Sequence, residues 1–249
     1  MSPDRRRPPD VRPEPLVASL SRLSALNAVE MAVIRAMAGR AEEQRAGAEL
    51  LGEGESAPKL IVSGWGCRQR LLADGRRQVF GFLLPGDPIG VCVDSRPVAL
   101  ATAVALTRVV TVDAAPLVAA ARDAETHPGL ARIVALAPEA EERRLLDHIV
   151  RLGRRSGAER VAHLLLEVRD RLVVAGVGGE RRFPFPVTQE TLADALGLSI
   201  VHINRILQQF RRDGLIQVMA GHVSLISPVA LAAVAEAQGR AAAGWRAPA

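Results

Sequence analysis

The sequence predicts an α+β fold with an N-terminal antiparallel β-roll, one long helix, and a C-terminal domain of short helices and a hairpin. The first observation is a series of short apolar runs separated by glycines over residues 48–113, which is typical of strands. The second is an apolar stripe with helical spacing within residues 126–155. The third is a pair of helix signals around a glycine, followed by alternating residues, in residues 188–226. The 249 residues are enough for two domains with separate cores.

We expect five parts along the chain. Residues 1–15 are dense in proline and arginine and should form a disordered tail, and they lack the apolar segment of a signal peptide. A β-roll domain is expected over residues 16–125, a long helix over 126–155, and a C-terminal domain over 156–235. Residues 236–249 should form a second tail, rich in alanine.

The first half of the chain changes from helical to strand-like character. Residues 16–45 should form short helices, because their leucines recur at a roughly helical spacing. Strands are then predicted from the apolar runs 59–62, 78–84 and 109–112. Asp74-Gly75 is a strong tight-turn signal and should join two strands as a hairpin. The pattern therefore favours an antiparallel β-roll.

The long helix carries Leu145, Ile149 and Leu152 at an i, i+4, i+7 spacing, with charged residues on either side. Pro128 and Pro138 should each mark a helix start or a kink, since proline is tolerated only in the first turn of a straight helix. Such an apolar stripe can pack on its own domain or pair with the same helix of a second copy. The residues alone leave both possibilities open.

Two short helices joined by a sharp turn are predicted after residue 187. Thr188 and Ser199 are suitable N-caps, and Gly197 supplies the permissive backbone that a reversal needs. Alternating residues around Ala220-Gly221 predict a hairpin directly after the second helix. This is the layout of a winged helix-turn-helix, whose helices should meet at Leu192, Leu196, Leu198, Ile203 and Ile206.

In that layout the second helix enters the major groove of DNA. Arg205 is the main candidate for base contact, because arginine binds guanine through two hydrogen bonds, while Asn204 and Gln208 suit adenine. Threonine, serine and histidine side chains are better suited to phosphates. A solvated polar face, which any surface helix has, is the alternative for each position. The candidate DNA-binding residues are Thr188, Ser199, Val201, His202, Asn204, Arg205, Gln208 and, on the hairpin, His222.

Several stretches carry a resemblance to a known family. The recognition-helix run is Val201-His202-Ile203-Asn204-Arg205, and further stretches are GRRSGAERVAHLLLEVRDRL at 153–172, SGWGCR at 63–68, ADGRRQVFGFLLPGD at 73–87 and Ile89-Gly90. Together they resemble the Crp/Fnr superfamily of bacterial regulators, and most closely its group with a V-H-I/V-N-R recognition helix. The resemblance covers most of residues 20–235. It implies a cyclic-nucleotide-binding-like β-roll sensor, a dimerisation helix and a winged helix-turn-helix DNA-binding domain.

The resemblance also implies how such a protein works. It would be a homodimeric transcription regulator that binds an inverted repeat in double-stranded DNA, with Leu145, Ile149 and Leu152 in the dimer interface. RNA polymerase is a further candidate partner, and the sequence does not indicate whether transcription is activated or repressed. No apolar run approaches the about 20 residues of a membrane span, so a cytoplasmic location without membrane contact is expected.

The sequence says less about the effector, the small molecule that would bind the β-roll. Family members that bind a cyclic nucleotide use a Gly-Glu pair for the ribose and an Arg-Ser pair for the phosphate. The corresponding positions here are Gly90-Val91 and Ala99-Leu100, so the phosphate would lack its arginine unless Arg96 replaces it. The resemblance therefore argues against cAMP as the effector. A regulator without any effector remains open.

Other cofactors are disfavoured on similar grounds. Cys67 and Cys92 cannot supply the four ligands that the family's iron–sulfur cluster needs in one subunit. A haem would need an axial ligand such as His127, His148 or Cys92, and a lone histidine on a helix is more often structural. The two cysteines have no metal-ligand spacing, and their roles stay open.

Composition and motifs limit the remaining function classes. The net charge of +5 favours a polyanionic partner only weakly, because the basic excess lies outside residues 188–226, for example at Arg151, Arg155 and Arg160. The sequence has no phosphate-binding glycine loop, G-x-S-x-G or H-E-x-x-H motif, so an enzyme is not expected. The alternative function is a ligand-binding regulatory module that acts on a protein partner. A protein-binding face should show aromatic or aliphatic anchors, and the polar face with Arg205 argues against it.

Overall fold

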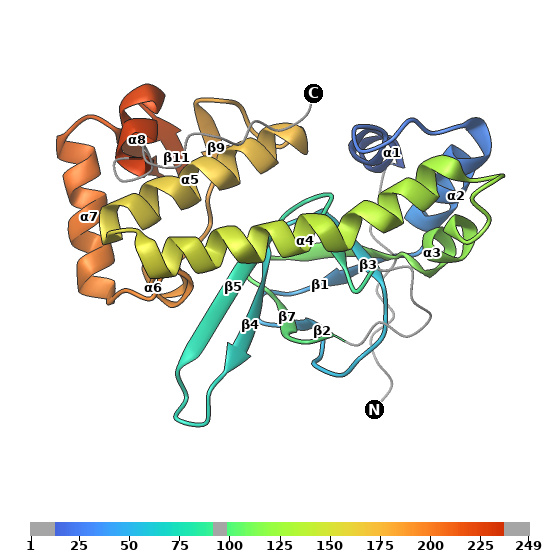
Figure 1. Cartoon of the computed structure of the whole chain (residues 1–249), viewed down its shortest axis with the longest axis horizontal. Helices are drawn as coiled ribbons and strands as arrows, with labels where there is room; N and C mark the ends of the chain where they lie inside the picture. Colours follow the sequence, from blue (N-terminus) through green and yellow to red (C-terminus); the bar gives the residue numbers. More distant parts are fainter. Residues whose placement is uncertain (1–12, 92–98, 237–249) are drawn as a thin grey trace. The chain divides into compact units, whose positions relative to one another are not determined.

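The computed structural model describes residues 13–91 and 99–236. The chain divides into two compact units, residues 1–145 and residues 146–249, and helix α4 (Pro128–Arg154) runs from the first into the second (Figure 1). The α+β fold class predicted from the sequence is confirmed, because antiparallel sheets, a long helix and a C-terminal helix-turn-helix follow one another along the chain. Within the described residues, no helix is both long and apolar enough to cross a membrane.

The first unit is built on antiparallel sheets. One sheet has the strand order β1-β8-β3-β6 and another has the order β2-β7-β4-β5. Gly75, with a φ of 83°, lies in the turn between β4 and β5, where Asp74-Gly75 predicted a hairpin. The strands are β1 (Ala41–Gln44), β2 (Glu49–Leu51), β3 (Lys59–Ser63), β4 (Gly66–Leu71), β5 (Arg77–Leu83), β6 (Pro88–Ile89), β7 (Thr102–Ala105) and β8 (Val109–Asp113).

The start of the chain departs from the sequence prediction in two places. Helices α1 (Pro13–Ser21) and α2 (Ala28–Ala38) account for only part of the helical stretch expected over 16–45, because Ala41–Gln44 form β1. These residues pair with β8 in antiparallel register, and that ladder of backbone hydrogen bonds outweighs their helical preference. Helix α1 also begins inside the expected tail 1–15. The rest of that tail and residues 237–249 of the second tail lie outside the described residues.

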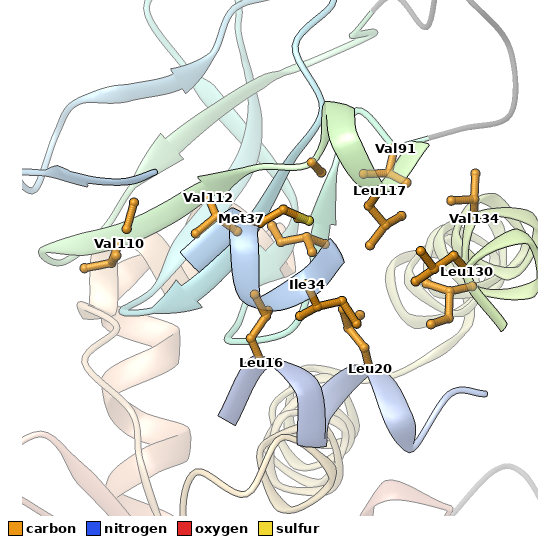
Figure 2. Packing of buried hydrophobic residues seen from close by; sticks show 14 residues of the cluster. Leu16, Leu20, Ile34, Met37, Val91, Val110, Val112, Leu117, Leu130 and Val134 are labelled. Atoms are coloured by element: carbon orange, nitrogen blue, oxygen red, sulfur yellow. The ribbon is translucent and has the colours of Figure 1, made fainter. Parts of the chain in front are cut away.

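One core cluster of the first unit lies between the helices and strand β8 (Figure 2). A second cluster joins the facing sheets through residues such as Leu50, Ile61 and Leu83. Fully burying one such aliphatic side chain stabilises the fold by about 1.5–3 kcal/mol. The cluster in Figure 2 combines α1 (Leu16, Leu20), α2 (Ile34, Met37), β8 (Val110, Val112), α3 (Ala115–Ala121, with Leu117) and α4 (Leu130, Val134).

The start of α4 is fixed by a buried carboxylate. Glu30 is 1% exposed and accepts hydrogen bonds from the backbone N–H groups of Asn27 at 2.7 Å and Leu130 at 3.0 Å. Asn27 Oδ1 accepts the backbone N–H of Glu30 at 2.9 Å, which completes a capping box for α2. The negative charge lies favourably at the N-terminus of α4. Helix α4 starts at Pro128 and contains Pro138 in its interior.

The second unit contains the helix-turn-helix and its wing. Its sheet has the order β10-β11-β9, so the hairpin gains β9, a strand that the sequence pattern did not predict. Helix α5 packs on α7 and α8, and Leu165, Leu196 and Phe183 of this unit are completely buried. The elements are α5 (Gly157–Val174), β9 (Arg182–Pro184), α6 (Gln189–Leu196), α7 (Ile200–Arg212), β10 (Ile216–Met219), β11 (His222–Leu225) and α8 (Pro228–Ala235).

Candidate functional site

The two helices of the helix-turn-helix are positioned by short-range hydrogen bonds. At the start of α6 the backbone N–H of Thr191 donates to Thr188 Oγ1 at 3.1 Å, and at the start of α7 that of His202 donates to Ser199 Oγ at 3.2 Å. Between them Gly197 ends α6 with a φ of 61°, a left-handed conformation that costs a residue with a side chain about 1–2 kcal/mol. The caps and the turn predicted from the sequence are confirmed.

Helix α7 has one buried face and one open face. The buried face carries Ile203, Ile206, Leu207 and Phe210. A row at i, i+4, i+7 and i+11 spacing runs along the opposite side, and we call it the outward stripe: Val201, Arg205, Gln208 and Arg212. All four are exposed, Val201 by 80%. The side chains of Arg205 and Gln208 form no hydrogen bond or ion pair with any described residue. The structure thus brings three predicted DNA-binding residues onto one surface, together with Arg212, an exposed residue that was not predicted from the sequence.

Two other predicted DNA-binding residues lie beside the stripe. Asn204 is half-buried, and its Nδ2 donates to Gln189 Oε1 of α6 at 3.2 Å. His202 is also half-buried and faces the start of α5, because a Cβ added to Gly157 would lie 3.1 Å from His202 Nε2. Both side chains therefore lie against other residues of the second unit, whereas Arg205 is exposed.

The last predicted DNA-binding residue, His222, lies on the wing next to the turn of the β10–β11 hairpin. The turn of the β10–β11 hairpin consists of Ala220 and Gly221, both with positive φ, at 50° and 72°. Positive φ at both central positions is the hairpin geometry that normally selects asparagine and glycine, so Ala220 is strained. His222 follows the turn half-buried, with its Nδ1 3.0 Å from the carbonyl oxygen of Ala220, and Met219 before the turn is 62% exposed.

Arg160 of α5 holds the turn of the helix-turn-helix in place. Its Nη1 donates to the carbonyl oxygen of Leu196 at 2.9 Å, and its Nε donates to that of Arg155 at 2.8 Å. The last carbonyls of a helix have no partner inside the helix, so Arg160 satisfies one at the end of α6. From the sequence, Arg160 was evident only as one of the basic residues near the middle of the chain. The glycine at the end of α6 was the available signal for this contact. It marks the end of the helix, where backbone carbonyl groups need a hydrogen-bond donor from outside the helix.

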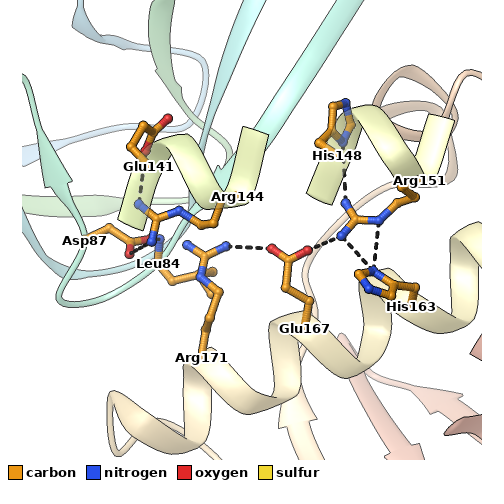
Figure 3. Close-up of polar contacts among 9 residues, drawn as sticks. All are labelled: Leu84, Asp87, Glu141, Arg144, His148, Arg151, His163, Glu167 and Arg171. Atoms are coloured by element: carbon orange, nitrogen blue, oxygen red, sulfur yellow. Dashed lines mark hydrogen bonds and ion pairs between the residues drawn. The ribbon is translucent and has the colours of Figure 1, made fainter. Parts of the chain in front are cut away.

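A polar cluster joins α4 to α5 within the second unit (Figure 3). Arg151 is 3% exposed and forms an ion pair with Glu167, and its guanidinium donates to His163 Nδ1 at 2.9 Å and to His148 Nδ1 at 3.4 Å. Arg171 contacts the other oxygen of Glu167 at 3.4 Å. Because an arginine only donates, each histidine accepts at Nδ1 and is neutral. We call this set, Arg151, His148, His163, Glu167 and Arg171, the α4–α5 junction.

Burial and the charges of this junction shift the pKa values of its histidines and of Glu167. Burial, followed by the charge of Arg151, lowers the pKa of His148 and of His163 to about 4. Burial alone would raise the pKa of the Glu167 carboxyl, but the charges of Arg151 and Arg171 hold it below its usual value. The Nε2 of His148 is buried without a hydrogen-bond partner among the described residues. These histidines are therefore built into the structure as neutral groups.

The other side of α4 is open and apolar. Leu145 is 38% exposed, Leu146 56%, Ile149 64% and Val150 50%. We call these four the α4 apolar face. Two of them, Leu145 and Ile149, were expected from the sequence. Leu152, the third expected residue, is half-buried inside the second unit, where a Cβ added to Gly197 would lie 3.6 Å from its Cδ2.

The first unit contains a cavity of about 400 Å³. Its lining includes Gly90, Val91, Ala99 and Leu100, four of the five residues predicted to bind an effector. Arg96, the fifth, and Cys92 lie outside the described residues. The walls are otherwise mostly apolar, with Leu51 and Ile89 among them.

The arginines that line this cavity come from β4 and were missed by the sequence analysis. Arg68 forms an ion pair with Glu141, and its Nη2 donates to the carbonyl oxygen of Pro88 at 3.1 Å. Arg70 donates to the carbonyl oxygen of Leu100 at 2.6 Å and lies 3.5 Å from Glu53. Both guanidinium groups are therefore occupied by protein acceptors. An anionic ligand would have to compete with these carboxylates.

The groups that could hold a metal are few. Cys67 is buried in β4, with its Sγ 3.7 Å from Gln69 Oε1. Across residues 13–91 and 99–236, no group of three or more His, Cys, Asp or Glu side chains is arranged to hold a metal ion.

The chain is similar in sequence and in structure to known regulatory proteins. Residues 159–234 match the family described as the Crp-like helix-turn-helix domain. The nitrogen fixation regulation protein FixK of Bradyrhizobium diazoefficiens is 38% identical over 168 residues, which are 68% of this chain and 69% of that protein. The transcriptional activatory protein AadR of Rhodopseudomonas palustris is 31% identical over 178 residues, 71% of this chain and 72% of that protein. The solved structure of FixK2 from Bradyrhizobium japonicum superposes with a TM-score of 0.67 at 28% identity, covering 78% of this chain and 96% of that one. These relatives are regulators of transcription and not enzymes.

Proposed function

Because this chain belongs to the Crp/Fnr family of DNA-binding transcription regulators, we propose that it acts as a homodimer on an inverted-repeat site. The observation that carries the proposal is the outward stripe of α7. It presents Arg205 and Gln208 without partners among the described residues, on the helix that enters the major groove in this class of domain. Arg205 would bind guanine, and the hydroxyls of Thr188 and Ser199 lie at the exposed helix starts, where phosphates bind.

The α4 apolar face supports the homodimer. Four neighbouring aliphatic side chains exposed on one helix mark an interaction surface. A second copy presents the same face, so two copies can bury it around a two-fold axis. A dimer then places two recognition helices about one DNA turn apart, which matches an inverted repeat. We assign the interface to Leu145, Leu146, Ile149 and Val150 and leave Leu152 to internal packing.

The cavity of the first unit supports an effector other than cAMP. A cyclic phosphate needs a cation, and the two cations among the described lining residues, Arg68 and Arg70, are already paired with Glu141 and Glu53. The mostly apolar walls favour a ligand without a phosphate, or regulation without a ligand. Since the relative AadR is a transcriptional activatory protein, we further propose contact with RNA polymerase at the bound site, in the cytoplasm where the chromosome lies.

The experiment is a titration of the purified full-length protein against a labelled duplex from the region upstream of its own gene. It is done without ligand and then with cAMP. We expect tight binding without ligand, two protomers per duplex and no change with cAMP. Binding that requires cAMP would overturn the effector proposal and would mean that Arg96, or an arginine of β4 released from its carboxylate, holds the phosphate. Binding to this duplex and to a scrambled duplex with equal affinity would overturn sequence-specific regulation at this site.

A further inference from the structure

The first turn of α7 exposes two aliphatic side chains. Ile200 is 49% exposed and Val201 is 80% exposed. Neither position is explained by folding, because the buried face of α7 is already supplied by Ile203, Ile206, Leu207 and Phe210. Valine and isoleucine are also weaker helix formers than the charged and polar residues usual on an open helix face. An apolar contact with a partner would bury both side chains.

The position of Val201 identifies the partner. It lies on the outward stripe one helical turn before Arg205, and the N-terminal residues of a recognition helix are those that contact base edges. In the major groove the C5-methyl of thymine is the apolar group that the bases offer. We propose that Val201, with Ile200 beside it, contacts a thymine methyl and thereby specifies an A·T pair near the guanine bound by Arg205. This inference rests on the proposed function.

The placement of Asn204 strengthens the assignment. An asparagine on a recognition helix can bind adenine through two hydrogen bonds. Here the Nδ2 of Asn204 donates to Gln189 Oε1 at 3.2 Å, and the side chain is half-buried. This bond uses one of the two N–H groups of the amide and orients it toward α6. Asn204 is thus a positioning residue that ties α7 to α6, and A·T recognition falls to the apolar side chains of the first turn.

Replacement of thymine by deoxyuridine tests this directly, because it removes only the methyl group. The full-length protein is first used to enrich a duplex from a random-sequence pool. Each thymine of one half-site is then replaced by deoxyuridine, one at a time, and affinity is measured by fluorescence anisotropy. We expect one or two positions at which binding weakens about four-fold, the value for one methyl group removed from an apolar contact.

The same series with Val201→Ala assigns the contact. Alanine is a good helix former, so the variant should fold, and the effect of deoxyuridine should disappear because the valine methyls are gone. Val229→Ala is the matched control: Val229 is 82% exposed on α8, off the outward stripe, and the deoxyuridine effect should persist.

Two results would overturn the inference while leaving the proposed function intact. One is specific binding in which no thymine is sensitive to deoxyuridine. The other is a sensitivity that remains in full in Val201→Ala, which would show that Val201 does not make the thymine contact. If the pool yields no enriched sequence at all, the proposed function and this inference both fail.

Discussion

The outward stripe of α7 and the α4–α5 junction are both rich in polar side chains, but they differ in how these groups are satisfied. At the junction, Arg151 is 3% exposed and binds Glu167 and two histidines. On the stripe, Arg205 and Gln208 are exposed and have no partner among the described residues. Both regions belong to the second unit. The difference separates arginines that hold helices together from those that are available to a partner.

This difference explains why net charge was a weak guide to function. Much of the basic excess near the middle of the chain contacts protein atoms: Arg151 at the junction, Arg160 at the end of α6, and Arg155 at the carbonyl oxygen of Ala235. These three arginines are therefore not available to a surface such as the stripe. DNA recognition is therefore expected to depend on a small number of directed contacts together with dimerisation, rather than on a broad basic patch.

The largest effect should come from the α4 apolar face. Ile149→Glu places a charge in the proposed dimer interface and should give monomers, because the buried carboxylate would lack a partner. Loss of the second recognition helix should weaken binding to the inverted repeat by about 100-fold or more. Analytical ultracentrifugation and anisotropy measure the two effects. Ile149→Leu is the control and should stay dimeric. A dimeric Ile149→Glu would remove this face from the interface.

Substitution of Arg160 tests whether the arginines that bond to protein atoms stabilise the fold. Arg160→Ala removes donors from the carbonyl oxygens of Leu196 and Arg155, which should lower the free energy of unfolding by about 1–3 kcal/mol. Urea denaturation measures this. Arg160→Lys keeps the charge but cannot supply both hydrogen bonds, so it should recover only part of the loss. Unchanged stability, together with a shallower dependence of DNA affinity on salt, would instead make Arg160 a phosphate contact.

A smaller loss of stability should follow when the pH is lowered. His148 and His163 have a pKa of about 4 in the folded chain, whereas unfolded histidines take up protons near their ordinary pKa of 6.5. Stability should therefore fall as the pH drops from about 6.5 to 4, by on the order of 1 kcal/mol between pH 7.5 and 6.0. The lowered pKa of Glu167 adds a further loss when the pH falls below its ordinary value of 4.5.

Urea denaturation of the variant His148→Phe at the same pH values checks the source of this acid sensitivity. The variant should lose less stability between pH 7.5 and 6.0 than the wild type. His222→Gln, on the wing and away from Arg151, is the matched control and should behave like the wild type. Equal acid sensitivity in His148→Phe and the wild type would show that His148 is not a source of the effect.

The features that the sequence predicted well are those with short-range causes. The caps at Thr188 and Ser199 and the turn at Gly197 each depend on hydrogen bonds or backbone angles within a few residues. The glycine turn at Asp74-Gly75 is of the same kind. A single sequence contains these causes in full, and the helix-turn-helix could therefore be located before its surroundings were known.

The features that the sequence could not supply depend on distant partners. Strand β1 exists because it pairs with β8, which is far away in the chain. The bond from Asn204 to Gln189 is formed only once α6 and α7 have packed. The α4 apolar face required knowing which side of the helix is buried, and helical spacing alone included Leu152 in place of Leu146 and Val150. The arginines of the cavity likewise became evident only from the fold of β4.

Base recognition by Arg205 is tested most directly by the effect of Arg205→Ala on binding to the enriched duplex and to a scrambled duplex. Arg205 is open on the stripe, so the variant should unfold in urea like the wild type. We expect affinity for the enriched duplex to fall by about 1–3 kcal/mol, or about 5- to 150-fold, with relaxed preference at one base pair of each half-site and little change on scrambled DNA. Equal losses on both duplexes would contradict base recognition by Arg205 and reduce the stripe to a phosphate-binding surface.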